Sequence, residues 1–219
     1  DCFVAITGLE ADGHRYIGSA LAQGAAAIVG EKTLEEIETL LASEMPVPYV
    51  QVANSREALA YLAAAWYDHP ARDLRVIGVT GTDGKTTTVN LISAILQAAG
   101  YRTGLVSSVS AVIDGQKQDT GFHTTTPEAL DIQRYLADMA QAGADYAILE
   151  STSHGLAQHR VTACEYDVAA FTNITHEHLD YHGSEDAYFQ AKCRLFEELL
   201  PAGATAVLNA DSDRFDDIA

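Results

Sequence analysis

The chain has 219 residues, of which 47% are hydrophobic and 20% are charged, so it is long enough for one or two globular domains. This composition excludes disordered, collagen-like and coiled-coil proteins. Thirteen Lys and Arg against 31 Asp and Glu give a net charge of −18, which repels polyanions and argues against nucleic-acid and anionic-membrane partners.

Targeting signals and cysteine pairs are not evident in the sequence. No apolar run approaches the roughly 20 residues of a membrane helix, and the start lacks a signal-peptide pattern, so we expect a cytoplasmic protein. Cys2, Cys164 and Cys193 form no Cys-x-x-Cys pair, and we expect buried or idle thiols. The chain begins at Asp1 rather than Met and stops after the acidic stretch DSDRFDDIA, which we interpret as a fragment of a longer protein.

The first 70 residues alternate between apolar strands and helices. The predicted strands cover residues 2–8, 26–30 and 48–52, and the predicted helices cover residues 16–23, 34–43 and 55–67. This alternation is typical of an α/β layer. The segment DHPARDL at residues 68–74 carries a Pro and a charge cluster, so we predict a domain boundary there, with one domain over 1–70 and a second over 71–219.

The second domain repeats the alternation on a larger scale. The predicted strands cover residues 75–80, 104–110, 146–151, 168–174 and 204–210, and the predicted helices run from Gly84 to about Ala99, over 128–142 and over 185–200. Strands that are apolar throughout, placed between helices, indicate a mostly parallel sheet covered on both faces. The fold class is therefore α/β, with a small N-terminal domain and a larger mononucleotide-binding domain.

The segment GVTGTDGKTTT at residues 78–88 links a predicted strand to a predicted helix. A Gly-rich turn at a helix N-terminus directs backbone N–H groups and a partial positive charge at an anion. Lys85 would reach the β- and γ-phosphates of a nucleotide, and the Thr86 hydroxyl would ligate Mg²⁺. Val79 stands where the usual phosphate loop has its first Gly, so the loop fits a shorter Gly-x-x-Gly-Lys-Thr form. The alternative is a glycine-rich turn with a surface lysine.

Glu150 ends the apolar run that starts at Tyr146, at the carboxyl end of a buried parallel strand. Open α/β sheets bind ligands at that edge, and a carboxylate there could complete the coordination of nucleotide-bound Mg²⁺. The polar run Ser-Thr-Ser-His follows at once and favours this interpretation. The alternative is a solvated carboxylate at the rim of the sheet.

A histidine cluster follows the strand over residues 168–174. The segment FTNITHEHLDYHGS holds His176, His178, Asp180 and His182. His-x-His-x-Asp-His is typical of two-zinc hydrolases of the metallo-β-lactamase type, but the last His is displaced here by one residue. That hypothesis also leaves the phosphate loop unexplained. We expect His176 and His182 to be hydrogen-bonded loop residues rather than metal ligands.

Two cations remain ambiguous from the residues alone. By its position in the predicted helix over 185–200, Lys192 is a helix-surface lysine with a solvated head. Arg160 could clamp a substrate carboxylate or form a salt bridge within its loop.

Four segments together resemble the Mur ligase family in their order and spacing: GVTGTDGKTTT, TTTPEALDIQ, LESTSHGLAQHRV and FTNITHEHLDYHGSEDAYFQAKCRLF. The resemblance is strongest to the members that build the tripeptide of peptidoglycan precursors. It extends into the first domain, where CFVAITGLEADGHRYIGSALAQGAAAIV is similar to the family's UDP-binding domain. Nearly the whole chain is covered.

The resemblance implies a role for each matching residue. The ATP loop would be Gly81, Thr82, Asp83, Gly84, Lys85, Thr86 and Thr87, with Asp83 where Asn is usual. The substrate contacts would be Leu9, Glu10, Ala11, Thr124, Thr125, Thr126, Thr152, Gln158 and Arg160; the first three replace the commoner His-Gln-Ala, and Thr152 replaces Ser. The magnesium ligands would be Thr86, Glu150, His178 and Lys192, the last as a carbamate. Lys85, His178 and Lys192 would be catalytic.

The activity that this resemblance implies is an ATP- and Mg²⁺-dependent ligase of cell-wall synthesis. It would join a diamino acid, meso-diaminopimelate or L-lysine, to UDP-N-acetylmuramoyl-L-alanyl-D-glutamate through an acyl phosphate. We expect a cytoplasmic monomer whose partners are this nucleotide sugar and a free amino acid. We also expect the fragment alone to be inactive, because family members carry a further N-terminal segment and a third domain. The alternatives are a folylpolyglutamate or cyanophycin synthetase and a nucleotide-binding module without ligase activity.

Overall fold

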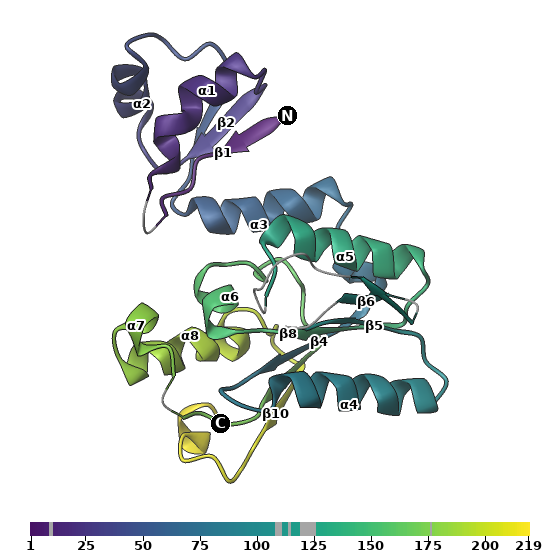
Figure 1. Ribbon diagram of the computed structural model, residues 1–219. Helices are drawn as coiled ribbons and strands as arrows, with labels where there is room; N and C mark the ends of the chain where they lie inside the picture. The colour runs from purple at the N-terminus through teal and green to yellow at the C-terminus, as the bar shows by residue number, and fades with distance from the viewer. Residues whose placement is uncertain (9–10, 108–110, 114, 119–125, 176) are drawn as a thin grey trace. The chain divides into compact units, whose positions relative to one another are not determined.

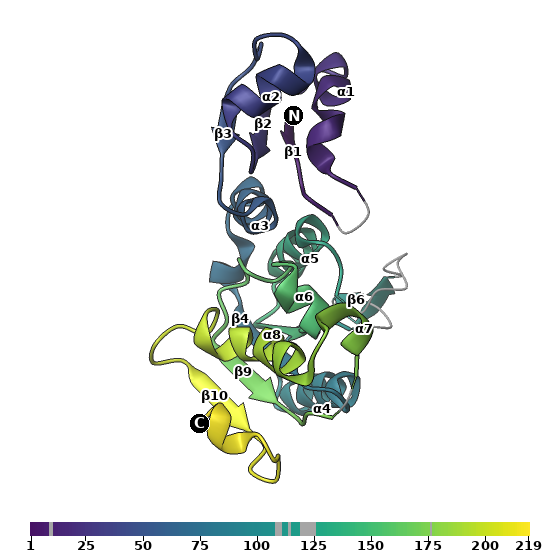
Figure 2. The ribbon, with the colours of Figure 1, turned by 90° about the vertical axis from the view of Figure 1, so that its left-hand side faces the viewer.

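The computed structural model describes residues 1–8, 11–107, 111–113, 115–118, 126–175 and 177–219. The chain divides into two compact units, Asp1–Leu59 and Ala60–Ala219. Figures 1 and 2 show the ribbon from two directions. The division falls inside helix α3 (Ser55–Trp66), N-terminal to the boundary predicted at residues 68–74.

The first unit is a small parallel α/β layer. Its strands pair in the order β1-β2-β3, with β1 over Cys2–Val4, β2 over Ala27–Gly30 and β3 over Tyr49–Gln51. The helices are η1 (Gly13–Tyr16), α1 (Ile17–Ala22), α2 (Leu34–Leu41) and the start of α3. Thr33 and Glu36 form a reciprocal capping box that begins α2. Ala5, Ile17, Ile28 and Ile37 are buried together as the core.

The second unit contains a seven-stranded sheet in the order β10-β9-β4-β8-β5-β6-β7. Its strands are β4 (Arg75–Thr80), β5 (Thr103–Val106), β6 (Ala111–Ile113), β7 (Gln116–Gln118), β8 (Tyr146–Glu150), β9 (Val168–Phe171) and β10 (Thr205–Leu208). The pairings from β10 across to β5 are parallel, whereas β5-β6 and β6-β7 are antiparallel. The mostly parallel sheet is confirmed, and the short antiparallel strands β6 and β7 were not predicted.

Helices cover both faces of this sheet, as Figure 1 shows for α4 and α5. The described helices of the second unit, beyond the end of α3, are η2 (Pro70–Asp73), α4 (Lys85–Ala98), α5 (Ala129–Gln141), α6 (Ser153–Ala157), α7 (Leu179–His182), α8 (Glu185–Glu197) and η3 (Phe215–Asp217). On one face Val89 of α4 packs with the strand residues Ile77 and Ile148. The opposite face packs against α5, α6 and α8 through residues such as Leu136 and Leu195. Among the described helices, none is long and apolar enough to cross a membrane.

Candidate nucleotide-binding site

The loop between β4 and α4 is fastened to the end of β9. Thr172 donates its hydroxyl proton to the Asp83 carbonyl at 2.7 Å, and the Asn173 side-chain oxygen accepts from the Asp83 N–H at 2.8 Å. Gly81 has φ +144°, and a Cβ at this position would lie 1.9 Å from Thr172 Oγ1. A side chain at position 81 would therefore displace the anchor of the loop, which explains the glycine.

Lys85 and Thr86 open α4 at the carboxyl edge of the sheet. Lys85 Nζ donates to the carbonyls of Thr82 at 2.6 Å and Gly81 at 3.1 Å, so the lysine folds back over the loop. Thr86 Oγ1 donates to Glu150 Oε2 at 2.9 Å. The Glu150 side chain ends β8 and is only 3% exposed. The structure thus places the phosphate-loop threonine against the strand-end carboxylate.

Lys192 is buried rather than at the helix surface, so the expectation from its position in the helix is wrong. It is 1% exposed, donates to the Gly81 carbonyl at 2.6 Å, and lies 4.3 Å from the centre of the Tyr188 ring. Burial, with a smaller contribution from the charge of Lys85, lowers the pKa of Lys192 to about 7. A large part of the amine is therefore neutral near pH 7.

The histidine segment is organised around the ring of His154, on α6. Its ring centre lies 4.7 Å from that of His178, 5.3 Å from that of His182 and 4.2 Å from that of Tyr181. His178 has φ 53° and precedes α7, and half of its side chain is exposed. Burial lowers the pKa of His182 to about 4, so this ring is neutral near pH 7.

The two-zinc hypothesis involves His176, which is not among the described residues, so only part of its ligand set can be examined. In the described part of the chain, no group of three or more His, Cys, Asp or Glu side chains is placed to hold a metal ion. The His182 Nε2 atom is buried without a hydrogen-bond partner among the described residues. The His182 ring instead packs against the ring of His154. His176 lies outside the described residues.

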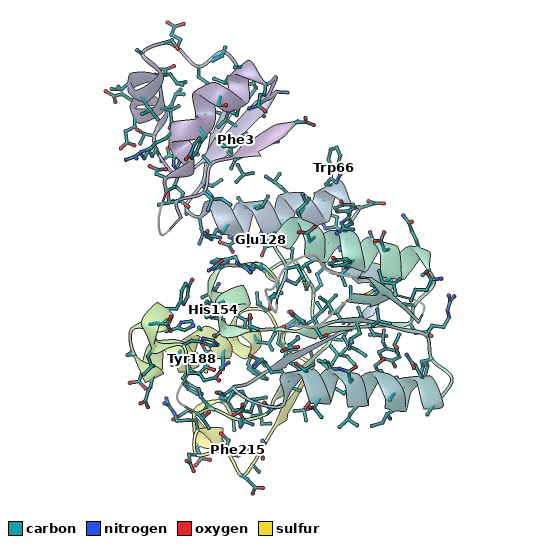
Figure 3. All side chains as sticks on the ribbon, in the orientation of Figure 1. Phe3, Trp66, Glu128, His154, Tyr188 and Phe215 are labelled. Atoms are coloured by element: carbon teal, nitrogen blue, oxygen red, sulfur yellow. The ribbon has the colours of Figure 1, made fainter. Side chains whose placement is uncertain are left out.

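A cleft of about 390 Å³ lies where these elements meet. It is lined by Thr82, Asp83, Gly84, Lys85, Thr86, Thr87, Glu150, Thr152, Ser153, Glu177, His178, Tyr188 and Lys192. These residues come from the loop, β8, the start of α6, the segment before α7 and α8. The cleft thus brings together the described residues of the predicted ATP loop, except Gly81, and all four predicted metal ligands. Figure 3 labels Tyr188 and His154 in this region.

Four of the predicted substrate contacts form one hydrogen-bonded network beside the cleft. Thr126 and Thr152 join their hydroxyl groups at 2.8 Å. Arg160 Nη1 donates to the Thr126 carbonyl at 2.7 Å, and its Nη2 donates to Gln158 Oε1 at 2.8 Å. Arg160 also pairs with Glu128, so a salt bridge is present at this residue.

The other predicted substrate contacts are not part of this network. Leu9, Glu10, Thr124 and Thr125 lie outside the described residues, and Ala11 lies exposed in the first unit. In that unit, hydrogen bonds from Lys32 and His14 hold the pKa of Asp12, next to Ala11, well below its ordinary value.

Sequence reasoning missed Tyr188, Glu128 and the central place of His154. Tyr188 precedes Lys192 by one helical turn, so helical spacing would have placed both on one face of α8. Burial raises the pKa of Tyr188, whose hydroxyl lies 3.1 Å from Thr82 Oγ1. No sequence pattern pointed to Glu128, because its contact with Arg160 joins a helix terminus to a loop far along the chain.

The class of protein follows from this arrangement. A glycine-rich loop joins a buried parallel strand to a helix N-terminus, its Lys and Thr face a cleft, and a buried carboxylate ends the adjacent strand. This combination defines an α/β domain of the P-loop nucleotide-binding class.

The chain belongs to the Mur ligase family. Residues 79–219 match the family's middle domain, "Mur ligase middle domain", and residues 1–67 match "Mur ligase family, catalytic domain". The resemblance seen in the sequence is thereby confirmed.

Relatives and solved structures agree with this assignment. The UDP-N-acetylmuramyl-tripeptide synthetase of Roseiflexus sp. (strain RS-1) is 47% identical over 220 residues, which cover 95% of this chain and 42% of the relative. A solved structure of a UDP-N-acetylmuramoyl-L-alanyl-D-glutamate--2,6-diaminopimelate ligase has a TM-score of 0.79 and 30% identity, covering all of this chain and 42% of that one. E. coli FolC in complex with ADP has a TM-score of 0.55 and 26% identity, and covers 68% of this chain and 40% of its own. The chain thus spans less than half the length of these proteins.

Proposed function

We propose that the full-length protein is an ATP-dependent amide ligase that joins a diamino acid to UDP-N-acetylmuramoyl-L-alanyl-D-glutamate. The observation that carries this proposal is the convergence of Lys85, Thr86, Glu150 and Lys192 on one cleft, in a chain whose relatives are tripeptide synthetases. The match of residues 1–67 to a Mur ligase domain favours this substrate over a folate. A soluble nucleotide sugar and a free amino acid as partners also fit a cytoplasmic monomer.

The phosphates of ATP would lie on the loop and the N-terminus of α4. Backbone N–H groups there point outward from the helix and favour negative charge. Lys85 Nζ would exchange the Gly81 and Thr82 carbonyls for phosphate oxygens, which hold it more strongly because they are charged. These contacts act at short range, so the net charge of −18 does not prevent an anion from binding.

Two residues that line the cleft, Thr86 and Glu150, fit a magnesium ion. Glu150 and Thr86 supply a carboxylate and a hydroxyl oxygen that already touch, and oxygen ligands are those that Mg²⁺ prefers. When bound, the ion would reduce the repulsion between the nucleotide and a substrate carboxylate. His178 and Lys192 line the same cleft and complete the proposed ligand set.

Lys192 would serve that set as a carbamate. Its neutral amine would attack carbon dioxide, so that a C–N bond forms and the nitrogen loses a proton, which leaves an anion on the buried side chain. The carbamate nitrogen keeps one N–H, so the hydrogen bond to the Gly81 carbonyl can remain.

In the proposed reaction the γ-carboxylate of D-glutamate attacks the γ-phosphorus of ATP. The bond from that phosphorus to the β-bridging oxygen breaks and ADP leaves. The amine of the diamino acid then attacks the acyl carbon of the acyl phosphate, and inorganic phosphate leaves as the amide forms. Arg160, with Thr126, Thr152 and Gln158, would position the D-glutamate end, because bound geometry supplies most of the catalysis in such reactions.

The proposal is tested by phosphate release from ATP in the full-length protein. We expect release only when UDP-N-acetylmuramoyl-L-alanyl-D-glutamate and one diamino acid, meso-diaminopimelate or L-lysine, are both present. UDP-N-acetylglucosamine serves as the control nucleotide sugar without a peptide. A protein that binds Mg·ATP but releases no phosphate with any of these combinations would contradict the proposal.

A further inference from the structure

Both terminal nitrogens of the Arg160 guanidinium have partners among the described residues. The Arg160 side chain is 14% exposed, and it donates to the Thr126 carbonyl through Nη1 and to Gln158 Oε1 through Nη2. Glu128, the residue before α5, adds its carboxylate at 2.8 Å from Nη2. Figure 3 shows Glu128 where α5 begins.

One donor of Arg160 has no partner among the described residues. Its Nε–H is buried, and no described residue accepts from it. In a guanidinium the Nε–H and one Nη2–H point to the same side, and this edge matches the two oxygens of a carboxylate. Glu128 Oε1 lies 2.8 Å from Nη2, the other nitrogen of that edge. A carboxylate that bound the whole edge would satisfy the buried Nε–H and would take the place of Glu128.

The Glu128 side chain can leave its ion pair with Arg160 at little cost. This side chain is 53% exposed, whereas that of Arg160 is 14% exposed, so the acid can return to water while the base cannot. A half-exposed ion pair contributes little, so its loss costs little. A buried guanidinium left without any counter-charge would cost much more, which is a physical reason for the chain to carry its own acid here.

We propose that Glu128 is an internal counter-ion of Arg160 that the incoming substrate carboxylate displaces, so that Glu128 sets how tightly this subsite takes an anion. This inference rests on the proposed function, because it assumes that Arg160 meets the D-glutamate end of the substrate. Glu128 is not among the described residues that line the cleft, and it acts through Arg160 as a residue that determines affinity and selectivity.

The test is the affinity of the full-length protein for UDP-N-acetylmuramoyl-L-alanyl-D-glutamate, measured by calorimetry. Glu128→Gln removes the competing charge, and we expect about two- to fivefold tighter binding, the range set by a half-exposed ion pair. Binding of UDP-N-acetylglucosamine, which has no carboxylate, should stay unchanged. Asp131→Asn is the matched control, because it removes another acid that pairs with an arginine on α5.

Arg160→Gln completes the experiment. Alone it should weaken binding of the dipeptide substrate by about tenfold or more, since a charge-assisted bidentate contact is lost. In the Arg160→Gln background, Glu128→Gln should no longer tighten binding. If Glu128→Gln merely loosened the fold, it would weaken substrate binding. The tighter binding that we expect therefore distinguishes the proposal from a structural effect.

Three outcomes would overturn the inference. Unchanged or weaker binding by Glu128→Gln, with normal binding by the parent and loss by Arg160→Gln, would refute the counter-ion and leave the proposed function standing. A gain that persists without Arg160 would show that Glu128 acts elsewhere. A parent protein that binds Mg·ATP but not the dipeptide substrate would refute the proposed function, and the inference with it.

Discussion

Replacing Lys85 with methionine is expected to lower kcat of the full-length ligase by about 10²–10³-fold, the usual effect of removing one preorganised charge from a reacting centre. In the proposed function Lys85 is the cation that meets the nucleotide phosphates, and methionine keeps the apolar part of its side chain. Steady-state phosphate release measures the effect. The folded state should remain, because Lys85 Nζ contacts only carbonyls of its own loop in the described chain.

Arg75→Met is the matched control for this substitution. Arg75 begins β4, the same strand whose other end leads into the loop, and it pairs with Asp167 while 70% of its side chain is exposed. Loss of that cation should leave kcat nearly unchanged. If Lys85→Met turns over within a few-fold of the parent, the phosphate loop does not act on the transferred group.

Lys192→Ala is expected to lower kcat by about 10²–10³-fold for a different reason, since the proposed magnesium site would lose a buried anionic ligand. Added acetate or propionate should restore part of the activity, because a short carboxylic acid can occupy the space of the carbamate. Lys192→Arg should be as inactive as the alanine variant and should not be rescued, because it keeps the cation and fills the space. Phosphate release with and without the acids is the measurement.

Two results would contradict the role of Lys192. An active Lys192→Arg variant would mean that a cation suffices at this position. Full loss without rescue, together with a lower urea midpoint, would mean that Lys192 holds the fold through the Gly81 carbonyl. The urea midpoint of Lys192→Ala therefore belongs to the same experiment.

The contact between Thr86 and Glu150 could be anticipated from the sequence. Glu150 ends β8, Thr86 follows the loop that leaves the end of β4, and adjacent parallel strands end at the same edge of a sheet, so topology brings the two residues together. The anchoring of the loop by Thr172 and Asn173 follows from the same rule, because β9 flanks β4 on its other side.

The burial of Lys192 could not be anticipated from local pattern. A lysine among mixed residues on a helix normally keeps its charge in water, and the Gly81 carbonyl that receives it lies 111 residues earlier in the chain. Only the packing of α8 against the sheet brings the two together. The resemblance to the Mur ligases pointed to Lys192. The structure shows that it is surrounded by the Gly81 carbonyl and the Tyr188 ring, which the helix pattern alone could not predict.

For the histidine segment, the spacing along the sequence did not predict how the side chains are arranged. Its spacing resembles that of two-zinc ligands, yet the rings of His178 and His182 pack edge to face against that of His154 on another helix. Spacing along a chain fixes neighbours only within one element, and here the segment leads into the short helix α7. The contact of Glu128 with Arg160 escapes sequence analysis for the same reason.

The proposed acyl phosphate on the substrate carboxylate is tested most directly by following oxygen transfer. The γ-carboxylate of D-glutamate in the nucleotide-sugar substrate is labelled with oxygen-18, and the full-length protein is given ATP, Mg²⁺ and the diamino acid. We expect each released phosphate to carry one labelled oxygen and each amide product to have lost one. Amide product formed together with unlabelled phosphate would contradict this proposal.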